Sequence, residues 1–239
     1  QPYNTLREDK WELYNTLEDF SLTNNLAEKE TDKLKAMQDL FMAEAKKYHA
    51  LPLDDRTFER MSASAVGRPS IMEGRTSVTY GEGMRGMGVD IFIDLRNTSY
   101  IMTAEVDVQE NANGVIVCQG GKFGGLSLYV KNGKPTFSYN YLGLGTTTIT
   151  ANKALKPGKN TVVFDFAYDG GGQGKGGLGT ISINGEKAGE GRLEKTQPGV
   201  FSVDDLADIG VDEGPWVADY GKSSKFTGRI KKVTIETRK

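Results

Sequence analysis

The sequence has very few of the side chains on which most protein-bound metals depend. Among its 239 residues there is one cysteine, Cys118, and one histidine, His49. A single cysteine excludes a disulfide within the chain and a cysteine-based zinc site, and one histidine is too few for a histidine-rich metal site. We expect Cys118 as a small core residue and His49 at a helix end. These counts do not exclude a hydrolase that uses carboxylates. Our prediction is nevertheless no catalytic residue, no metal ligand and no cofactor in this chain.

Two further absences narrow the possible partners. The chain has 30 Lys and Arg against 32 Asp and Glu, a net charge of −2, so it lacks the basic excess of a nucleic-acid-binding protein. It has no run of about 18 apolar residues, so we expect no membrane-spanning segment. Residues 1–4 have neither the basic start nor the apolar stretch of a signal peptide. We expect either a cytosolic protein or the removal of an upstream segment.

Two unlike parts make up the chain, and we place the division at residues 1–60 and 61–239. In the first part, residues 10–15 alternate between polar and apolar and predict a short strand. Residues 31–48 carry apolar side chains at helical spacing and predict one amphipathic helix with Thr31 as its N-cap. The small residues and proline of 51–70 indicate a linker. A lone helix and strand cannot bury their own apolar faces, so this part must pack on something else.

The second part repeats strand signals every ten to fifteen residues and has Asn-Gly turns at Asn132 and Asn184. The predicted strands are 76–80, 88–94, 99–108, 114–119, 125–131, 135–141, 146–150, 160–168, 178–183, 187–193, 206–210 and 226–237. Many short antiparallel strands without a second helix are typical of a jelly-roll β-sandwich. The predicted fold class is mainly β, with a small α+β segment ahead of the sandwich.

Glycine-rich stretches at 81–86 and 172–177 match the spacing of a dinucleotide fingerprint. That fingerprint must open a helix, whereas strands are predicted to follow both stretches, so we interpret them as loops between strands. Phe137, Tyr139 and Tyr141 alternate along one strand. They either stack on sugars from an open face or form the sandwich core, and spacing favours the core. Acidic residues after 165 either bind calcium or form a solvated rim.

A family resemblance covers nearly the whole chain. Residues 11–19 (WELYNTLED) and 24–27 (NNLA), followed by the helix and by 46–56, resemble the late part of type I sulfatases, the arylsulfatase family. Residues 119–125 (QGGKFGG), 139–144 (YNYLGL) and 164–172 (FDFAYDGGG) are similar to the concanavalin A-like or laminin G-like sandwich at the C-terminus of bacterial members. The resemblance implies a periplasmic or secreted protein, and a calcium ion in the catalytic domain of the parent sulfatase. The catalytic motif of the family has no counterpart here, because Gln119-Gly120-Gly121 follows Cys118.

Three functions follow from these observations. The leading one is a non-catalytic part of an arylsulfatase-like hydrolase, whose partner is the sulfatase catalytic domain or a second copy of this chain. The alternative is a free-standing carbohydrate-binding module for sulfated glycans. Its predicted ligand contacts are Gln119, Phe123, Tyr139, Tyr141 and Asp169. The third is a glycoside hydrolase using Asp165 and Glu105, which requires the two carboxyl groups to lie about 5 to 9 Å apart in a cleft.

Overall fold

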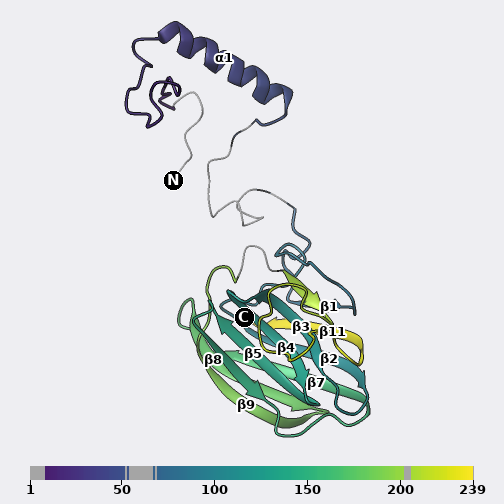
Figure 1. Ribbon diagram of the computed structural model, residues 1–239. Coiled ribbons are helices and arrows are strands. Elements are labelled where there is room, and N and C mark those ends of the chain that lie inside the picture. The colour runs from purple at the N-terminus through teal and green to yellow at the C-terminus, as the bar shows by residue number, and fades with distance from the viewer. Residues whose placement is uncertain (1–8, 52, 54–66, 68, 202–205, 239) are drawn as a thin grey trace. The chain divides into compact units, whose positions relative to one another are not determined.

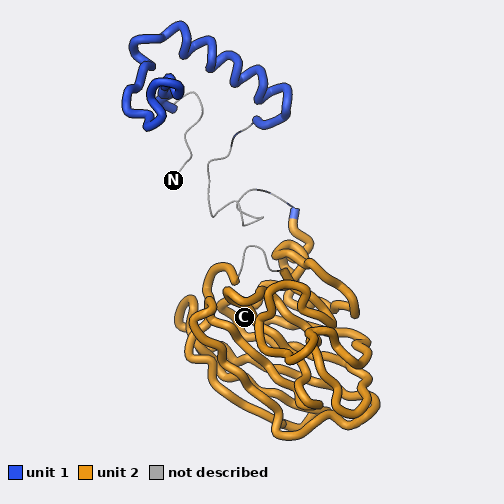
Figure 2. The backbone as a smooth tube through the Cα atoms, viewed as in Figure 1, with its two compact units in different colours: residues 1–69 blue, residues 70–239 orange. Residues whose placement is uncertain are grey.

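The computed structural model describes residues 9–51, 53, 67, 69–201 and 206–238. The chain divides into two compact units, Gln1–Pro69 and Ser70–Lys239, which Figure 2 colours separately. The boundary predicted at residue 61 lies outside the described residues. Within the described residues no helix is long and apolar enough to cross a membrane.

The N-terminal unit is built around one helix, α1 (Thr31–Lys47). Its N-cap is Glu30 rather than Thr31, which is the first helical residue. The strand predicted at 10–15 is wrong: these residues form no ladder, and Leu13 instead bonds through its backbone to the Asn25 side chain (3.1 Å) and the Leu26 amide (2.7 Å). Alternation alone does not make a strand where no neighbouring strand is available to pair with it.

The C-terminal unit is a sandwich of two antiparallel sheets, so the predicted mainly-β fold is confirmed (Figure 1). The strands are β1 (Ser77–Tyr80), β2 (Ser99–Val108), β3 (Gly114–Gly121), β4 (Gly124–Lys131), β5 (Lys134–Tyr141), β6 (Gly145–Thr150), β7 (Gly158–Tyr168), β8 (Lys175–Ile183), β9 (Glu186–Lys195), β10 (Ala207–Ile209) and β11 (Arg229–Arg238). One sheet has six strands in the order β1-β11-β2-β7-β8-β9, and the other has five in the order β10-β3-β4-β5-β6.

The Asn-Gly turns predicted from the sequence are confirmed. Asn132 and Gly133 between β4 and β5 have φ angles of 53° and 76°, and Asn184 and Gly185 between β8 and β9 have 53° and 84°. Two successive positive φ angles define the tight turn whose twist suits a hairpin, and asparagine followed by glycine tolerates them best.

The strand predicted at 88–94 is wrong. These residues form turns, and the ring of Phe92 stacks on Tyr80 with centroids 5.1 Å apart, while the Ile93 amide donates to the Tyr80 hydroxyl at 2.8 Å. Phe92 and Ile93 are therefore buried in the sandwich core without pairing in a sheet. The expectation that a strand directly follows the glycine-rich stretch 81–86 is wrong for the same reason.

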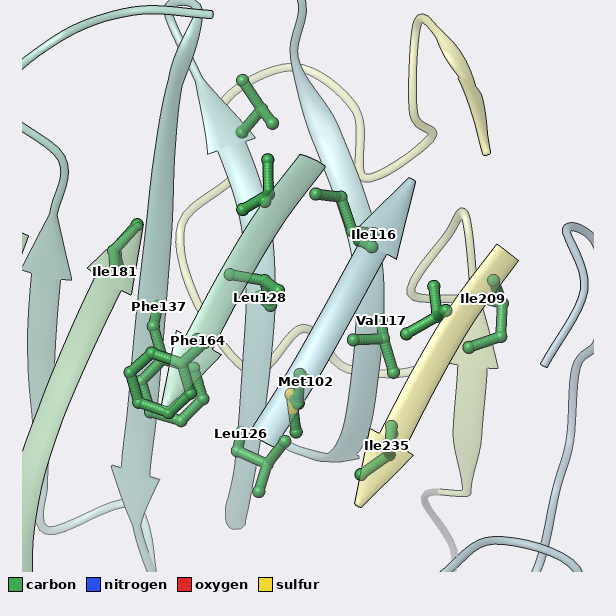
Figure 3. Packing of buried hydrophobic residues seen from close by; sticks show 14 of the residues in the cluster. Met102, Ile116, Val117, Leu126, Leu128, Phe137, Phe164, Ile181, Ile209 and Ile235 are labelled. Carbon is green, nitrogen blue, oxygen red and sulfur yellow. The ribbon is translucent and has the colours of Figure 1, made fainter. Parts of the chain in front are cut away.

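The core lies between the two sheets, and aromatic rings at its centre are packed face to face. Phe137 of β5 and Phe164 of β7 stack with centroids 3.7 Å apart and planes 9° apart (Figure 3). The sheets approach closely here because β8 has glycines under these rings. A Cβ at Gly179 would lie 2.7 Å from Ile149 Cδ1, and one at Gly177 would lie 2.5 Å from the Phe166 ring. A side chain at Gly179 would push against Ile149 of the other sheet, and one at Gly177 would clash with Phe166 of the neighbouring strand β7.

Candidate functional site

A covering segment, residues 211–224, lies against the outer face of the five-stranded sheet. Val217 and Tyr220 of this segment form a second apolar cluster with Val115, Cys118 and Tyr129 of β3 and β4. The rings of Tyr129 and Tyr220 meet edge to face, with centroids 5.0 Å apart. As a result β4 is buried on both faces along nearly its whole length, although an antiparallel sheet commonly exposes one face to water.

Asp212 holds the covering segment in shape from within. Its carboxylate accepts hydrogen bonds from the Val217 amide (3.0 Å) and the Tyr220 hydroxyl (2.8 Å), and its carbonyl accepts one from the Ser224 hydroxyl (2.8 Å). Asp212 and Tyr220 are both buried. Burial raises the pKa of the Tyr220 hydroxyl well above its ordinary value, so the phenol stays protonated and keeps donating to Asp212.

The covering segment leaves the edge strand β6 uncovered, and there three threonines point outward. This threonine row consists of Thr146, Thr148 and Thr150, all exposed, because they alternate with inward-facing Ile149. Buried hydroxyls on β5 support two of them. Ser138 bonds to Thr148 (2.9 Å), and Thr136 donates to Thr150 (3.4 Å). The row therefore presents partly oriented hydroxyl groups, each able to donate and accept a hydrogen bond.

An apolar end adjoins the threonine row. It consists of Phe123, Leu142, Leu144 and Trp216, which come from two hairpin turns and the covering segment. The exposed fraction is 68% for Phe123, 80% for Leu144 and 37% for Trp216. Apolar side chains gathered at such exposure mark a surface that meets another molecule.

Asn140, at the end of β5, ties the three loops of the apolar end together. Its side-chain amide donates to the carbonyl of Lys122 (2.9 Å) and approaches those of Gly121 (3.3 Å) and Val217 (3.5 Å). Its oxygen accepts from the Gly143 amide at 2.9 Å. Asn140 is buried, so these bonds are shielded from water and the loops are held in a fixed relation.

The threonine row and the apolar end together form one outer groove. A hollow of about 590 Å³ lies over the row, and another of about 540 Å³ lies at the apolar end. They share Thr146, Ala218 and Asp219 as lining residues, so they are continuous. Each alone has the size of a small-molecule site. The combination of hydroxyl groups with exposed apolar carbon suits a ligand that is polar around its edge and apolar on its faces.

Four charged side chains line the outer groove, Lys122, Lys131, Lys134 and Asp219, and two of them form an ion pair. The Lys131 ammonium bonds to the Asp219 carboxylate at 2.9 Å and to its carbonyl at 2.8 Å. The lysine and the Gly221 amide stabilise the carboxylate and lower the pKa of Asp219 below its ordinary value. Because this pair is neutral as a unit, the net charge of the lining comes from Lys134 near one end of the groove and Lys122 near the other.

The five predicted ligand contacts do not meet at one place. Phe123 lies at the apolar end of the outer groove. Tyr139 is buried in the core, where its hydroxyl accepts a hydrogen bond from the Gln197 amide at 2.7 Å, and Tyr141 packs against that core with the Lys195 ammonium 4.2 Å from its ring centre. Burial raises the pKa of Tyr139 to about 12. The alternative that these rings belong to the core accounts for their burial.

The other two predicted contacts lie elsewhere. Gln119 pairs with core residue Leu126 and so faces the inside of the sandwich, where its side-chain oxygen is buried without a hydrogen-bond partner among the described residues. Asp169 follows β7 in the six-stranded sheet and forms an ion pair with Arg192 (3.2 Å from Nη1 to Oδ1), which lowers the pKa of Asp169. As ligand contacts, these residues remain predictions.

Sequence reasoning missed the threonine row and Trp216. The signal for the row was present, because Ser138 and Asn140 alternate with the three core aromatics and must face outward once those rings face inward. Thr146, Thr148 and Thr150 alternate with Ile149 in the same way. No comparable signal marks Trp216, since the covering segment has no periodicity.

The carboxylate pair expected of a glycoside hydrolase meets contrary geometry. Asp165 pairs in register with Ile101 and Glu105 with Thr161, so the two carboxylates proposed for a glycoside hydrolase lie four residues apart along adjacent strands, about 13 Å. Each also forms ion pairs, Asp165 with Arg238 and Glu105 with Lys231 and Lys232. That distance and those partners do not suit a catalytic pair. Among the described residues, no group of three or more His, Cys, Asp and Glu side chains is placed to hold a metal ion.

No protein-family model and no curated protein matches the chain. Among solved structures it is similar to a Bacteroides ovatus protein proposed to bind carbohydrate (16% identity, TM-score 0.44, covering 69% of this chain and 45% of that one). It is also similar to mouse laminin α1 domains LG4–5 (13%, 0.41, 69% and 39%) and to a Limulus polyphemus pentraxin (12%, 0.40, 69% and 78%). The chain thus spans less than half of the first two. Likeness at this level concerns the arrangement of the sheets and says nothing of ligands.

Proposed function

We propose that the chain is a carbohydrate-binding module and that the outer groove is its binding site. The observation that carries this proposal is the continuity of the threonine row with the apolar end. Sugars have apolar C–H faces and hydroxyl edges, so they bind where exposed rings adjoin hydroxyl donors and acceptors. The same groove has no catalytic carboxylate pair, and binding without turnover suits it. We propose a periplasmic or extracellular location, where such ligands are found.

Titration of the full chain with a panel of oligosaccharides tests this function. The panel contains neutral cello-, xylo- and laminari-oligosaccharides and sulfated carrageenan and chondroitin oligosaccharides, and isothermal calorimetry measures binding. We expect at least one to bind, and Phe123→Ala to weaken binding about ten-fold, since an anchoring aromatic ring contributes more than 1 kcal/mol. Phe20→Ala, an aromatic that is 93% exposed in the N-terminal unit, is the matched control and should leave affinity unchanged.

Asp169→Asn separates the outer groove from the site predicted by sequence. Binding at the groove should not respond to this change, because Asp169 follows β7 of the six-stranded sheet and does not line the groove. A panel in which no oligosaccharide binds at millimolar concentration would overturn the proposed function. Binding that is lost with Asp169→Asn and retained with Phe123→Ala would move the site away from the groove.

A second candidate is an accessory part of an arylsulfatase-like hydrolase, and the observation in its favour is helix α1. Met37, Leu40 and Phe41 on this helix are 49%, 61% and 37% exposed, and among its residues only Ala45 is buried. Such a helix needs a partner to cover it, and the sulfatase catalytic domain with its calcium or a second copy of the chain are the candidates. Immunodetection of the native protein tests this idea: a band well above the mass of 239 residues supports it, and a band at that mass opposes it.

A further inference from the structure

The outer groove follows the whole of the edge strand β6. It begins at the turn between β5 and β6, where Leu142 and Gly143 line it, and reaches Asn132 and Lys134 at the turn between β4 and β5. From Gly145 to Thr150 the backbone advances about 17 Å at the rise of an extended strand. Because successive hairpin turns lie at opposite ends of a sheet, the groove crosses the sheet from one end to the other.

Neither end of the groove is closed, and only one long side has a wall. Leu144 is 80% exposed at one end, and Lys134 is exposed at the other. Ala218 and Asp219 of the covering segment form the wall. The opposite side is bounded by β6, the last strand of its sheet. A site for one terminal sugar would instead enclose it, as pockets for small ligands enclose most of the ligand surface.

Contact groups of one kind recur along this path. Thr146, Thr148 and Thr150 follow one another every second residue, so their hydroxyl groups recur about every 7 Å along the strand. Beside the row Lys131 is paired with Asp219, and the other charged lining residues, Lys134 and Lys122, lie toward the two ends of the groove. A periodic row of equivalent donors and acceptors suits a ligand that repeats one chemical unit along its length.

From this geometry, and resting on the proposed function, we infer that the outer groove binds an internal stretch of a linear glycan. Several consecutive sugar units lie along the threonine row and the apolar end together. The ends of the glycan continue past the two turns into solvent. The unit at the apolar end contacts Phe123, and units further along contact the threonines.

The test is the dependence of affinity on chain length, measured with the full protein. Oligosaccharides of one to six units, from whichever linear glycan of the panel binds best, are titrated by calorimetry, each with a free and with a methyl-capped reducing end. We expect affinity to rise with each added unit and then level off, and capping to leave it unchanged. Full affinity for the single sugar, or loss of binding on capping, would overturn the inference while leaving carbohydrate binding intact.

Two variants at opposite ends of the groove sharpen this test. Phe123→Ala and Thr150→Val should each weaken binding of the six-unit chain, Thr150→Val by about three- to ten-fold because it removes one neutral hydrogen-bonding group. Short chains should respond to one variant at most, because they cannot reach both ends. If Thr150→Val leaves the affinity for six-unit chains unchanged, the threonine row is not part of the site.

A matched control exists on the other sheet. Thr79 and Thr234 form a hydroxyl pair at 2.9 Å on the six-stranded sheet, and Thr136 and Thr150 form one at 3.4 Å in the groove. Thr234→Val therefore makes the same chemical change outside the groove and should leave binding unaltered. If no oligosaccharide of any length binds, both the proposed function and this inference fail. If oligosaccharides bind with an affinity that does not depend on their length, only this inference fails.

Discussion

The two sheets bury their inner faces in the same core, but their outer faces differ. On the six-stranded sheet, β2 and β7 alternate between buried and accessible residues, and the outer side chains form ion pairs such as those of Glu105 with Lys231 and Lys232. On the five-stranded sheet the outer face is covered over β3 and β4 and bears hydroxyl groups on β6. On the five-stranded sheet the covering segment forms a wall, and the outer groove lies between this wall and the uncovered strand β6.

Removing packing contacts of the covering segment should have the largest effect on stability. Tyr220→Ala deletes a buried ring from the second apolar cluster, and we expect a loss of about 3–5 kcal/mol in the free energy of unfolding, as for other large-to-small aromatic changes. Urea denaturation measures it. Tyr220→Phe retains the ring and loses only the hydroxyl bond to Asp212, so it should lose about 1–2 kcal/mol. Equal losses in the two variants would contradict the packing role of the ring.

Asn140→Ala should loosen the apolar end. It leaves the Lys122 carbonyl and the Gly143 amide without their partner, and we expect about 1–3 kcal/mol of destabilisation. In a Trp11→Phe background, Trp216 is the remaining tryptophan, and its fluorescence emission should move to longer wavelength as the loops open.

The control for Asn140 is another buried asparagine, Asn160 of β7, which donates to the carbonyls of Lys156 (2.7 Å) and Gly158 (2.9 Å). Asn160→Ala should be destabilising to a similar degree without shifting the Trp216 emission. An emission shift in both variants would mean that it reports general loosening rather than the three loops held by Asn140.

Alkali should lower the stability of the folded chain through its buried tyrosines. Tyr139, with a pKa raised to about 12, and Tyr220, with a raised pKa, are held neutral by burial. A tyrosine whose pKa is higher in the folded than in the unfolded chain contributes stability that is fully present below about pH 10 and is lost as pH rises toward the folded value. The urea midpoint should therefore fall from pH 10 to 12. A midpoint that stays flat across this range would contradict the burial of both phenols.

The smallest effect is expected on the exposed ion pairs of the six-stranded sheet. Glu105→Gln removes two pairs at the surface, and we expect no resolvable change in the urea midpoint, because water screens such pairs. The two lysines lower the pKa of Glu105, so what stability the pairs contribute should persist above the ordinary pKa and decline only as pH falls through the lowered value. An NMR titration of Glu105 with a midpoint at or above 4.5 would contradict this arrangement.

The sandwich could be predicted from sequence because its signals are local. Alternation in 99–108 and the Asn-Gly pair at Asn132 depend on side-chain period and on φ alone, and both were correct. The prediction of a strand at 88–94 was wrong because apolar residues of an irregular segment that pack into the core produce the same pattern as a strand. Residues 10–15 failed for the complementary reason, since a strand exists only where another strand pairs with it.

The candidate site was only partly predictable. Phe123 was found by the motif around it, whereas Trp216 lies in a segment without regular pattern whose position depends on the buried contacts of Asp212 and Tyr220. Such contacts join residues distant in sequence from β3 and β4, and no local rule anticipates them. The threonine row could have been predicted if the aromatic face of β5 had been assigned to the core. It was missed because the prediction from sequence left open which face of that strand points inward.

The cover over β3 and β4 also encloses the only thiol of the chain. Cys118 is 1% exposed and packs in the same cluster as Val217 and Tyr220. A thiol reagent in solution can react with it only when that cluster opens, so the rate of alkylation measures how often the wall lifts off the sheet. The same rate, compared with and without ligand, reports whether a bound ligand holds the wall in place.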